Sequence, residues 1–188
     1  LIRVSRVSGC SIGSIIALYY LTNSNYDINE MFLSIRKCFK ERFDLTQYAV
    51  CVREFIFDNM TEDLNCVNNI LHITYYDIVL GKQIVQNTFN SREHLLDCII
   101  RSSHIPYISN KEFKYKARYL DGITPHVFRD NKRPVLFVTM VTNSNYQRVF
   151  NTKNESTVNE RLLLGVHDIN TFVSTGKSEM CSYYNDWS

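Results

Sequence analysis

Ser11 lies in a G-x-S-x-G motif whose glycines are Gly9 and Gly13. A short extended run over 3–8 precedes the motif, and an apolar run over 15–21 follows it. This order predicts a strand, a sharp turn and a helix, with the serine at the turn. Such a turn exposes the serine hydroxyl in a strained backbone, and the glycines let strand and helix close around it. The pattern predicts a serine nucleophile and makes the chain a candidate serine acyl hydrolase.

The size and charge of the chain narrow the class of protein. With 188 residues, 45% hydrophobic and 21% charged, the chain is predicted to form one globular domain over 1–188. A net charge of +2 without long basic runs gives no reason to expect a nucleic-acid partner. No run of 18 apolar residues is present, so no membrane span and no signal peptide are expected. The chain begins at Leu1 without Met, and we expect a truncated or processed N-terminus, or a piece of a longer precursor.

The cysteines are widely spaced, without C-x-x-C pairs or Cys/His clusters that would build a zinc site. They are predicted to be free and mostly buried thiols in a reducing compartment, although six cysteines could instead pair in an extracellular domain. No metal or organic cofactor is expected. The six are Cys10, Cys38, Cys51, Cys66, Cys98 and Cys181.

Hydrophobic periodicity predicts the elements that would position Ser11. Apolar residues at helical spacing predict a helix over 28–43, and residues 44–64 are predicted to form short helical pieces of a lid or insertion. Two β-rich runs, 69–78 and 84–89, predict a hairpin. We expect Asn90 to cap the helix that follows.

The remainder of the chain predicts one more strand and one more helix. Residues 134–142 form a continuous apolar run, typical of a central strand buried on both faces. Thr157 and Glu160 predict a capping box for a last helix that ends near Gly176, before a tail over 177–188. The buried stripe of this helix is expected to hold Leu162, Val166, Ile169 and Val173. Alternating strands and helices predict an α/β sandwich with a partly parallel sheet.

Three segments in order carry a resemblance to a known family. They are L-H-I-T-Y-Y-D-I at 71–78, F-N-S-R-E-H-L-L-D-C-I-I-R-S-S-H-I-P at 89–106, and R-Y-L-D-G at 118–122. Together with the strand, turn and helix around Ser11, which we call the elbow, these segments resemble the patatin-like phospholipases. Their residues are most similar to those of the branch of adipose triglyceride lipase and adiponutrin. The resemblance covers roughly residues 6–130. It implies a three-layer α/β sandwich with a mostly parallel central sheet.

The resemblance also implies a catalytic dyad. Ser11 would be the nucleophile and Asp121, followed by the turn glycine Gly122, the carboxylate that activates it, because a serine hydroxyl needs a base within reach. An acyl-enzyme would form and be released by water. The backbone N–H of Ile12, at the start of the elbow helix, would stabilise the oxyanion. Implied substrates are acyl esters of phospholipids or neutral lipids.

The sequence departs from the family at two places. The family has a Gly-rich oxyanion loop before the elbow, and nothing before Gly9 matches it. We therefore expect this chain to lack the family's first strand and its oxyanion loop; one oxyanion donor alone is worth about 3–4 kcal/mol. Ile123 stands where the family has glycine or alanine after D-G, and Thr124-Pro125-His126 follows.

Two alternatives stay open. A Ser-Asp-His triad would use His126, in a loop near the site, or His167, which is expected on the surface of the last helix. A catalytically impaired domain could instead be a structural or interaction component, for example in a viral particle. The expected location is cytoplasmic or peripheral on a lipid surface, or a virion if the source is viral. Residues 55–57 are the expected lipid-contacting segment; the sequence does not predict an oligomeric state.

Overall fold

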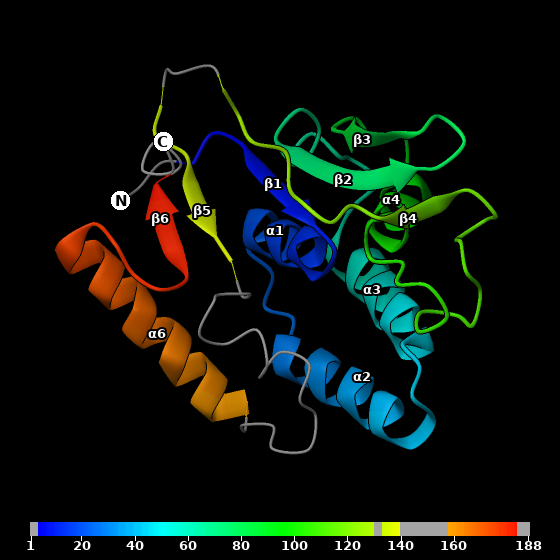
Figure 1. Ribbon diagram of the computed structural model, residues 1–188, viewed down its shortest axis with the longest axis horizontal. Helices are drawn as coiled ribbons and strands as arrows, with labels where there is room; N and C mark the ends of the chain where they lie inside the picture. The colour runs from blue at the N-terminus through cyan, green and yellow to red at the C-terminus, as the bar shows by residue number, and fades with distance from the viewer. Residues whose placement is uncertain (1–3, 130–132, 140–157, 184–188) are drawn as a thin grey trace. The chain divides into compact units, whose positions relative to one another are not determined.

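The computed structural model describes residues 4–129, 133–139 and 158–183, and its elements are drawn in Figure 1. The described part is mixed α/β, with five helices and a mixed sheet. Contacts divide the chain into two compact units, Leu1–His126 and Val127–Ser188. Each unit is described by itself below, and the single domain over 1–188 stays a prediction.

Four strands form the sheet of the first unit: β1 (Val7–Cys10), β2 (Leu71–Asp77), β3 (Lys82–Gln86) and β4 (Tyr119–Asp121). β1 runs parallel to β2, whereas β3 and β4 run antiparallel to it. The described sheet is therefore mixed and not mostly parallel as predicted. The hairpin of β2 and β3 is confirmed.

The register along β2 brings two strand ends together. β3 pairs along residues 73–77 of β2, so β1 and β4 must share the opposite edge. On that edge Cys10, the last residue of β1, lies opposite Thr74, and Asp121, the last residue of β4, lies opposite Tyr75. The carboxyl ends of β1 and β4 therefore meet at neighbouring positions of one strand.

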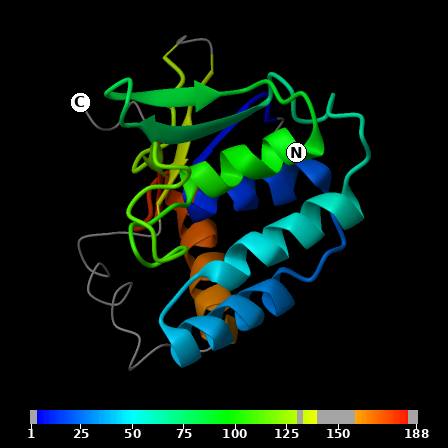
Figure 2. The ribbon, with the colours of Figure 1, turned by 90° about the vertical axis from the view of Figure 1, so that its right-hand side faces the viewer.

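Four helices accompany this sheet: α1 (Ile12–Thr22), α2 (Ile28–Arg42), α3 (Thr46–Asn59) and α4 (Arg92–Ser102). Figure 2 shows α1 and α4 side by side next to the sheet, with α2 and α3 forming a layer beyond them. α2 is capped at its N-terminus by Asp27, whose Oδ1 accepts the backbone N–H of Asn29. α4 is capped by Ser91, whose hydroxyl accepts the N–H of His94, so the cap predicted at Asn90 is one residue too early.

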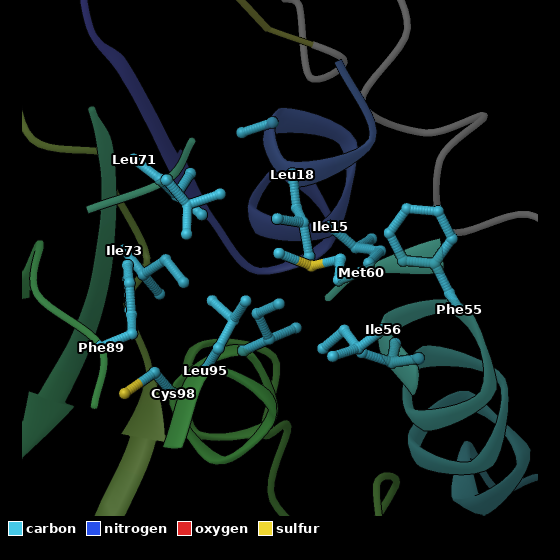
Figure 3. Close-up of a cluster of buried hydrophobic side chains, with 14 of the residues drawn as sticks. Ile15, Leu18, Phe55, Ile56, Met60, Leu71, Ile73, Phe89, Leu95 and Cys98 are labelled. Carbon is cyan, nitrogen blue, oxygen red and sulfur yellow. The ribbon is translucent and has the colours of Figure 1, made fainter. Parts of the chain in front are cut away.

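The core of this unit lies between the sheet and the helices (Figure 3). α3 contributes Phe55 and Ile56, both 0% exposed. These two residues cannot contact lipid, so that expectation is wrong for them, and residues 46–59 form one continuous helix in place of short pieces. The reason is a helical apolar face that is masked in the sequence by neighbouring acidic residues. That face consists of Tyr48, Cys51, Val52, Phe55 and Ile56.

The second unit contains a two-stranded antiparallel sheet, β5 (Leu136–Val138) with β6 (Cys181–Tyr183), and the helix α6 (Val158–Thr175). In the described residues β5 is three residues long, pairs with β6 alone, and leaves Leu136 and Val138 exposed. The prediction of a central strand buried on both faces is therefore wrong here. The predicted tail includes β6, so part of it is a strand.

α6 ends where expected, because Gly176 adopts a φ of 79° and donates its N–H to the carbonyl of Phe172. The capping residue Thr157 lies outside the described residues. Phe172 is buried, so the prediction for the buried face is wrong. The residues predicted to be buried are exposed: Leu162, Val166, Ile169 and Val173.

All six cysteines are free thiols, and four are buried: Cys38, Cys51, Cys98 and Cys181. Among the described helices, none combines the length and the apolar character that crossing a membrane requires.

Candidate active site

Ser11 occupies the turn between β1 and α1, as the motif predicts. Its backbone has φ 52° and ψ −134°, a conformation that sterically disfavours any residue with a Cβ. Hydrogen bonds hold both sides of the residue. The Ser11 N–H donates to the hydroxyl of Ser102 at 2.9 Å and to its carbonyl at 3.1 Å. The Ser11 carbonyl accepts the hydroxyl of Ser14 at 2.6 Å.

The two glycines of the motif have different roles. A Cβ added to Gly9 would lie 2.7 Å from the Cα of Ser14 and nearer still to the carbonyl oxygen of Gly13, so only glycine fits where β1 passes α1. A Cβ added to Gly13 would meet nothing within 4 Å. Gly9 is therefore required for the close approach of strand and helix, and Gly13 is not.

Asp121 is brought to Ser11 by the sheet and by α4. The register places the end of β4 beside the end of β1, and the Asp121 N–H donates to the carbonyl of His104 at 3.1 Å. The next N–H, that of Gly122, donates to the carbonyl of Ser102 at 3.3 Å. The same carbonyl accepts the N–H of Ser11, so the end of α4 holds both members of the predicted dyad.

The Asp121 carboxyl accepts the N–H of Ile123 at 2.8 Å and interacts with the Ser11 hydroxyl, an interaction that lowers its pKa. Burial raises the pKa of Asp121 above its ordinary value, and these interactions and nearby His104 oppose that rise without cancelling it. A raised pKa makes the carboxylate a stronger base toward the serine proton. The pair predicted from the resemblance is therefore in contact.

The backbone after Asp121 favours glycine at two positions, 122 and 123. A Cβ on Gly122 would lie 2.6 Å from the carbonyl carbon of Thr74, so this glycine is required. Ile123 adopts a φ of 62° with 80% of its surface exposed. A β-branched residue is strained there, at about 1–2 kcal/mol, which explains why glycine suits the position. The strained backbone aims the Ile123 N–H at Asp121.

The predicted oxyanion donor has the expected placement. Ile12 is the first residue of α1, and no hydrogen bond joins its N–H, or that of Gly13, to another described residue. First-turn N–H groups of a helix lack intrahelical acceptors and sit at the positive end of the helix dipole. The Ser11 N–H, in contrast, donates to Ser102.

A buried phenol lies behind the elbow. The Tyr48 hydroxyl is 2.9 Å from the hydroxyl of Ser103 and also hydrogen-bonds the Ser14 side chain. Burial raises the pKa of Tyr48 to about 12, so the phenol stays protonated and joins α3 to α1 and α4. The sequence analysis did not predict that Ser14 and Tyr48 contact the elbow, because no motif includes them. It also did not predict the contact of Ser102 with Ser11, although Ser102 begins the S-S-H-I-P segment of the resemblance.

The imidazole that acts on Asp121 is that of His104, which sequence reasoning also missed. His104 is 1% exposed, and its Nε2 has no hydrogen-bond partner among the described residues. Burial lowers the pKa of His104, against backbone hydrogen bonds at Glu112 and Phe113, so the ring is neutral at pH 7. His126 stacks on His72 with ring centroids 5.8 Å apart.

His167 is exposed on α6, as expected. Of the two predicted triad histidines, His167 belongs to the second unit and His126 is engaged with His72. Within the first unit, the histidine that acts on the pKa of Asp121 is therefore His104 and not His126.

Cys10, the neighbour of the serine, is a poor nucleophile. Burial, and then the charge of Asp121, raise the pKa of Cys10 to about 11, so the thiol remains protonated near neutral pH. In the part of the chain that the structure describes, no group of three His, Cys, Asp or Glu side chains could hold a metal ion.

No protein-family model matches this chain. Comparison with curated proteins gives no match either. The function is therefore argued from the geometry around Ser11 and Asp121.

Proposed function

We propose that the chain is a lipid acyl hydrolase of the patatin-like type, which cleaves acyl esters through a dyad of Ser11 and Asp121. The observation that supports this most strongly is that strand register and the Ser102 carbonyl bring a serine in a strained strand-to-helix turn to a carboxyl group of raised pKa, with which it interacts. The finer fold assignment, a three-layer patatin-like sandwich, is part of the same proposal.

The reaction follows from the positions of these groups. Asp121 accepts the Ser11 proton as Oγ attacks the ester carbonyl carbon, and the N–H of Ile12 binds the resulting oxyanion. Collapse of the tetrahedral intermediate releases the alcohol, which takes the proton from Asp121. Water then attacks the acyl-serine with Asp121 again as base, and the carboxylic acid leaves with Ser11 restored.

The magnitudes expected from these groups are large. A positioned general base contributes about 10²–10⁴-fold in rate, and one oxyanion donor about 10²–10³-fold. The first value belongs to Asp121 and the second to the Ile12 N–H.

The apolar surroundings of Ser11 favour a substrate with acyl chains. Ile12 and Ile16 lie one turn apart on α1 and are 38% and 47% exposed, and Ile123 directly after the dyad carboxylate is 80% exposed. Exposed apolar side chains around a polar reacting centre suit a lipid ester. Phospholipids and neutral lipids both fit this description.

The test combines covalent labelling with turnover. Wild type, Ser11→Ala and Asp121→Asn are treated with a fluorophosphonate probe and assayed on short-chain and long-chain esters, with His167→Ala as a control on the second unit. We expect labelling and turnover in wild type and in His167→Ala, neither in Ser11→Ala, and a loss of at least about 10²-fold in Asp121→Asn. Equal rates in wild type, Ser11→Ala and Asp121→Asn would refute the proposal. A folded wild type that is neither labelled nor active would favour the impaired scaffold.

A further inference from the structure

An exposed surface of aromatic and basic side chains lies on two loops of the first unit. One loop ends α2 and the other follows α4, and the Leu45 N–H donates to the carbonyl of Ile108 at 2.8 Å, which joins them. We call this the aromatic-basic surface. Its exposed members are Lys40, Phe43, Ile105, Tyr107, Lys111 and Phe113.

The end of α2 and the loop after α4 carry an excess of positive charge, part of which is paired, since Arg42 lies 4.0 Å from Asp44 and Lys116 lies 2.7 Å from Asp97. Residues 37–43 and 111–116 each contain three basic residues and one acidic residue. The whole chain has a net charge of only +2, so positive charge is concentrated here. Cations also sit on the aromatic side chains, since Nζ of Lys114 lies 5.9 Å from the ring centroid of Phe113.

Contacts within the chain account only in part for two aromatic residues of this surface, since the Phe43 ring lies 4.9 Å from that of Phe39 and the Tyr107 ring 5.6 Å from that of Phe113. Phe43 and Tyr107 adopt φ values of 54° and 64°, a left-handed conformation that bulky residues avoid. Their side chains are 69% and 65% exposed, so little burial offsets the strain. Asparagine or glycine would suit both backbone positions better. Large aromatic groups held outward at strained positions indicate a role in contacting something outside the chain.

The surface adjoins the candidate site through the chain itself. Ile105 follows His104, whose carbonyl holds the N–H of Asp121, and Ser102 just before holds Ser11. Figure 2 shows the segment after α4 on the same side of the unit as the start of α3. The segment that carries Ile105 and Tyr107 therefore begins directly after the residues that hold Ser11 and Asp121.

We propose that the aromatic-basic surface docks the protein on an anionic phospholipid bilayer. Phe43, Tyr107 and Phe113 enter the boundary between headgroups and acyl chains, where amphipathic rings are favoured, and Lys40 and Lys111 face anionic headgroups. The inference deepens the proposed function and rests on it for the lipid substrate. Exposed rings next to lysines favour a bilayer over an acidic protein, which would need the charges but not the strained aromatics.

The experiment measures binding of the full chain to vesicles by flotation. Vesicles of phosphatidylcholine alone are compared with vesicles that also contain phosphatidylserine, at low and high salt. One variant is Phe43→Asn with Tyr107→Asn, which keeps the backbone conformation accessible; a second is Lys40→Gln with Lys111→Gln. The matched control is Val79→Asn with Leu80→Asn in the hairpin turn, where the side chains are 68% and 54% exposed.

Wild type should bind the anionic vesicles, and more weakly at high salt. The lysine variant should bind about 25-fold more weakly, at about fivefold for each lysine. The aromatic variant should bind at least about tenfold more weakly, and the hairpin control should bind like wild type. No anionic-vesicle binding by wild type, or an equal loss in the control, would overturn the proposal. Self-association or capture by an acidic protein without vesicle binding would also overturn it.

The outcome is separable from that of the proposed function. Ser11→Ala should bind vesicles like wild type, and both surface variants should hydrolyse a soluble short-chain ester at the wild-type rate. Vesicle binding without ester hydrolysis would refute the hydrolase and leave the docking surface. Ester hydrolysis without vesicle binding would refute the docking surface and leave the hydrolase.

Discussion

The elbow makes a sharp prediction, because the two glycines of one motif should respond in opposite ways to the same substitution. Gly9→Ala places a Cβ 2.7 Å from the Cα of Ser14, where ordinary contacts begin at 3.4 Å. Backbone atoms on α1 cannot rotate away, so β1 and α1 must separate by about 0.7–1 Å. Gly13→Ala places its Cβ in open space.

The magnitudes follow from these contacts. Overpacking of this kind costs about 1–3 kcal/mol in the free energy of unfolding, and a misplacement of about 1 Å at a reacting group costs about 10²-fold in rate. At Gly13 the exchange for alanine in the first helical turn stabilises by up to about 1 kcal/mol. The two variants should therefore differ by about 1–4 kcal/mol, with Gly9→Ala the less stable.

Urea unfolding followed by circular dichroism gives the free energies, and ester hydrolysis gives the rates. Both variants carry the same added methyl group, so each is the control for the other. If Gly9→Ala unfolds within about 0.5 kcal/mol of wild type, or if Gly13→Ala is the less stable, the account of the elbow is wrong.

Other residues of the site give further predictions. Ser102→Ala removes one acceptor of the Ser11 N–H and should lower kcat about tenfold with KM unchanged, and an unaltered kcat would contradict its positioning role. Ile123→Gly relieves left-handed strain and should raise the free energy of unfolding by about 1 kcal/mol, measured in urea; a decrease would argue against strain. Because the pKa of Asp121 is raised, the acid limb of kcat/KM should have its midpoint above the ordinary aspartate value of about 3.9, and a midpoint below it would speak against Asp121 as base. Burial lowers the pKa of His104 in the folded state, so its contribution to the free energy of unfolding is fully present above the unfolded pKa of about 6.5 and is lost as the pH falls below that value. In His104→Gln, the urea midpoint should fall less steeply with decreasing pH. An unchanged dependence of the midpoint on pH would exclude His104 as its source.

Local patterns in the sequence were sufficient for several elements. The turn at Ser11, the β2–β3 hairpin and the helix before Ser102 depend on periodicity and turn residues within short windows, and the structure has all three. The motif predicts Ser11 as a site residue and the resemblance implies Asp121, and the structure places these two residues together. Their contact depends on pairing between distant segments.

Several misses share one physical cause, which is that partners across the fold leave no local pattern. The apolar run at 134–142 indicates burial but not which strands cover it, and β5 has β6 as its pairing partner in the described residues. Phe55 and Ile56 are buried because α3 faces the core, which acidic neighbours in the sequence conceal. Tyr48 and His104 act on the site through tertiary contacts of single side chains, which periodicity cannot mark.

Because β1 and β4 meet on one edge of β2, the proximity of Ser11 and Asp121 depends on the register of both strands. Cys10, the neighbour of Ser11, lies opposite Thr74 and Asp121 lies opposite Tyr75, so adjacent residues of a single strand set the spacing of the proposed dyad. A slip of either strand by two residues keeps the same faces inward yet shifts its end by about 7 Å. Such a variant would retain the G-x-S-x-G motif, Asp121 and a folded core, and the serine would be without its base.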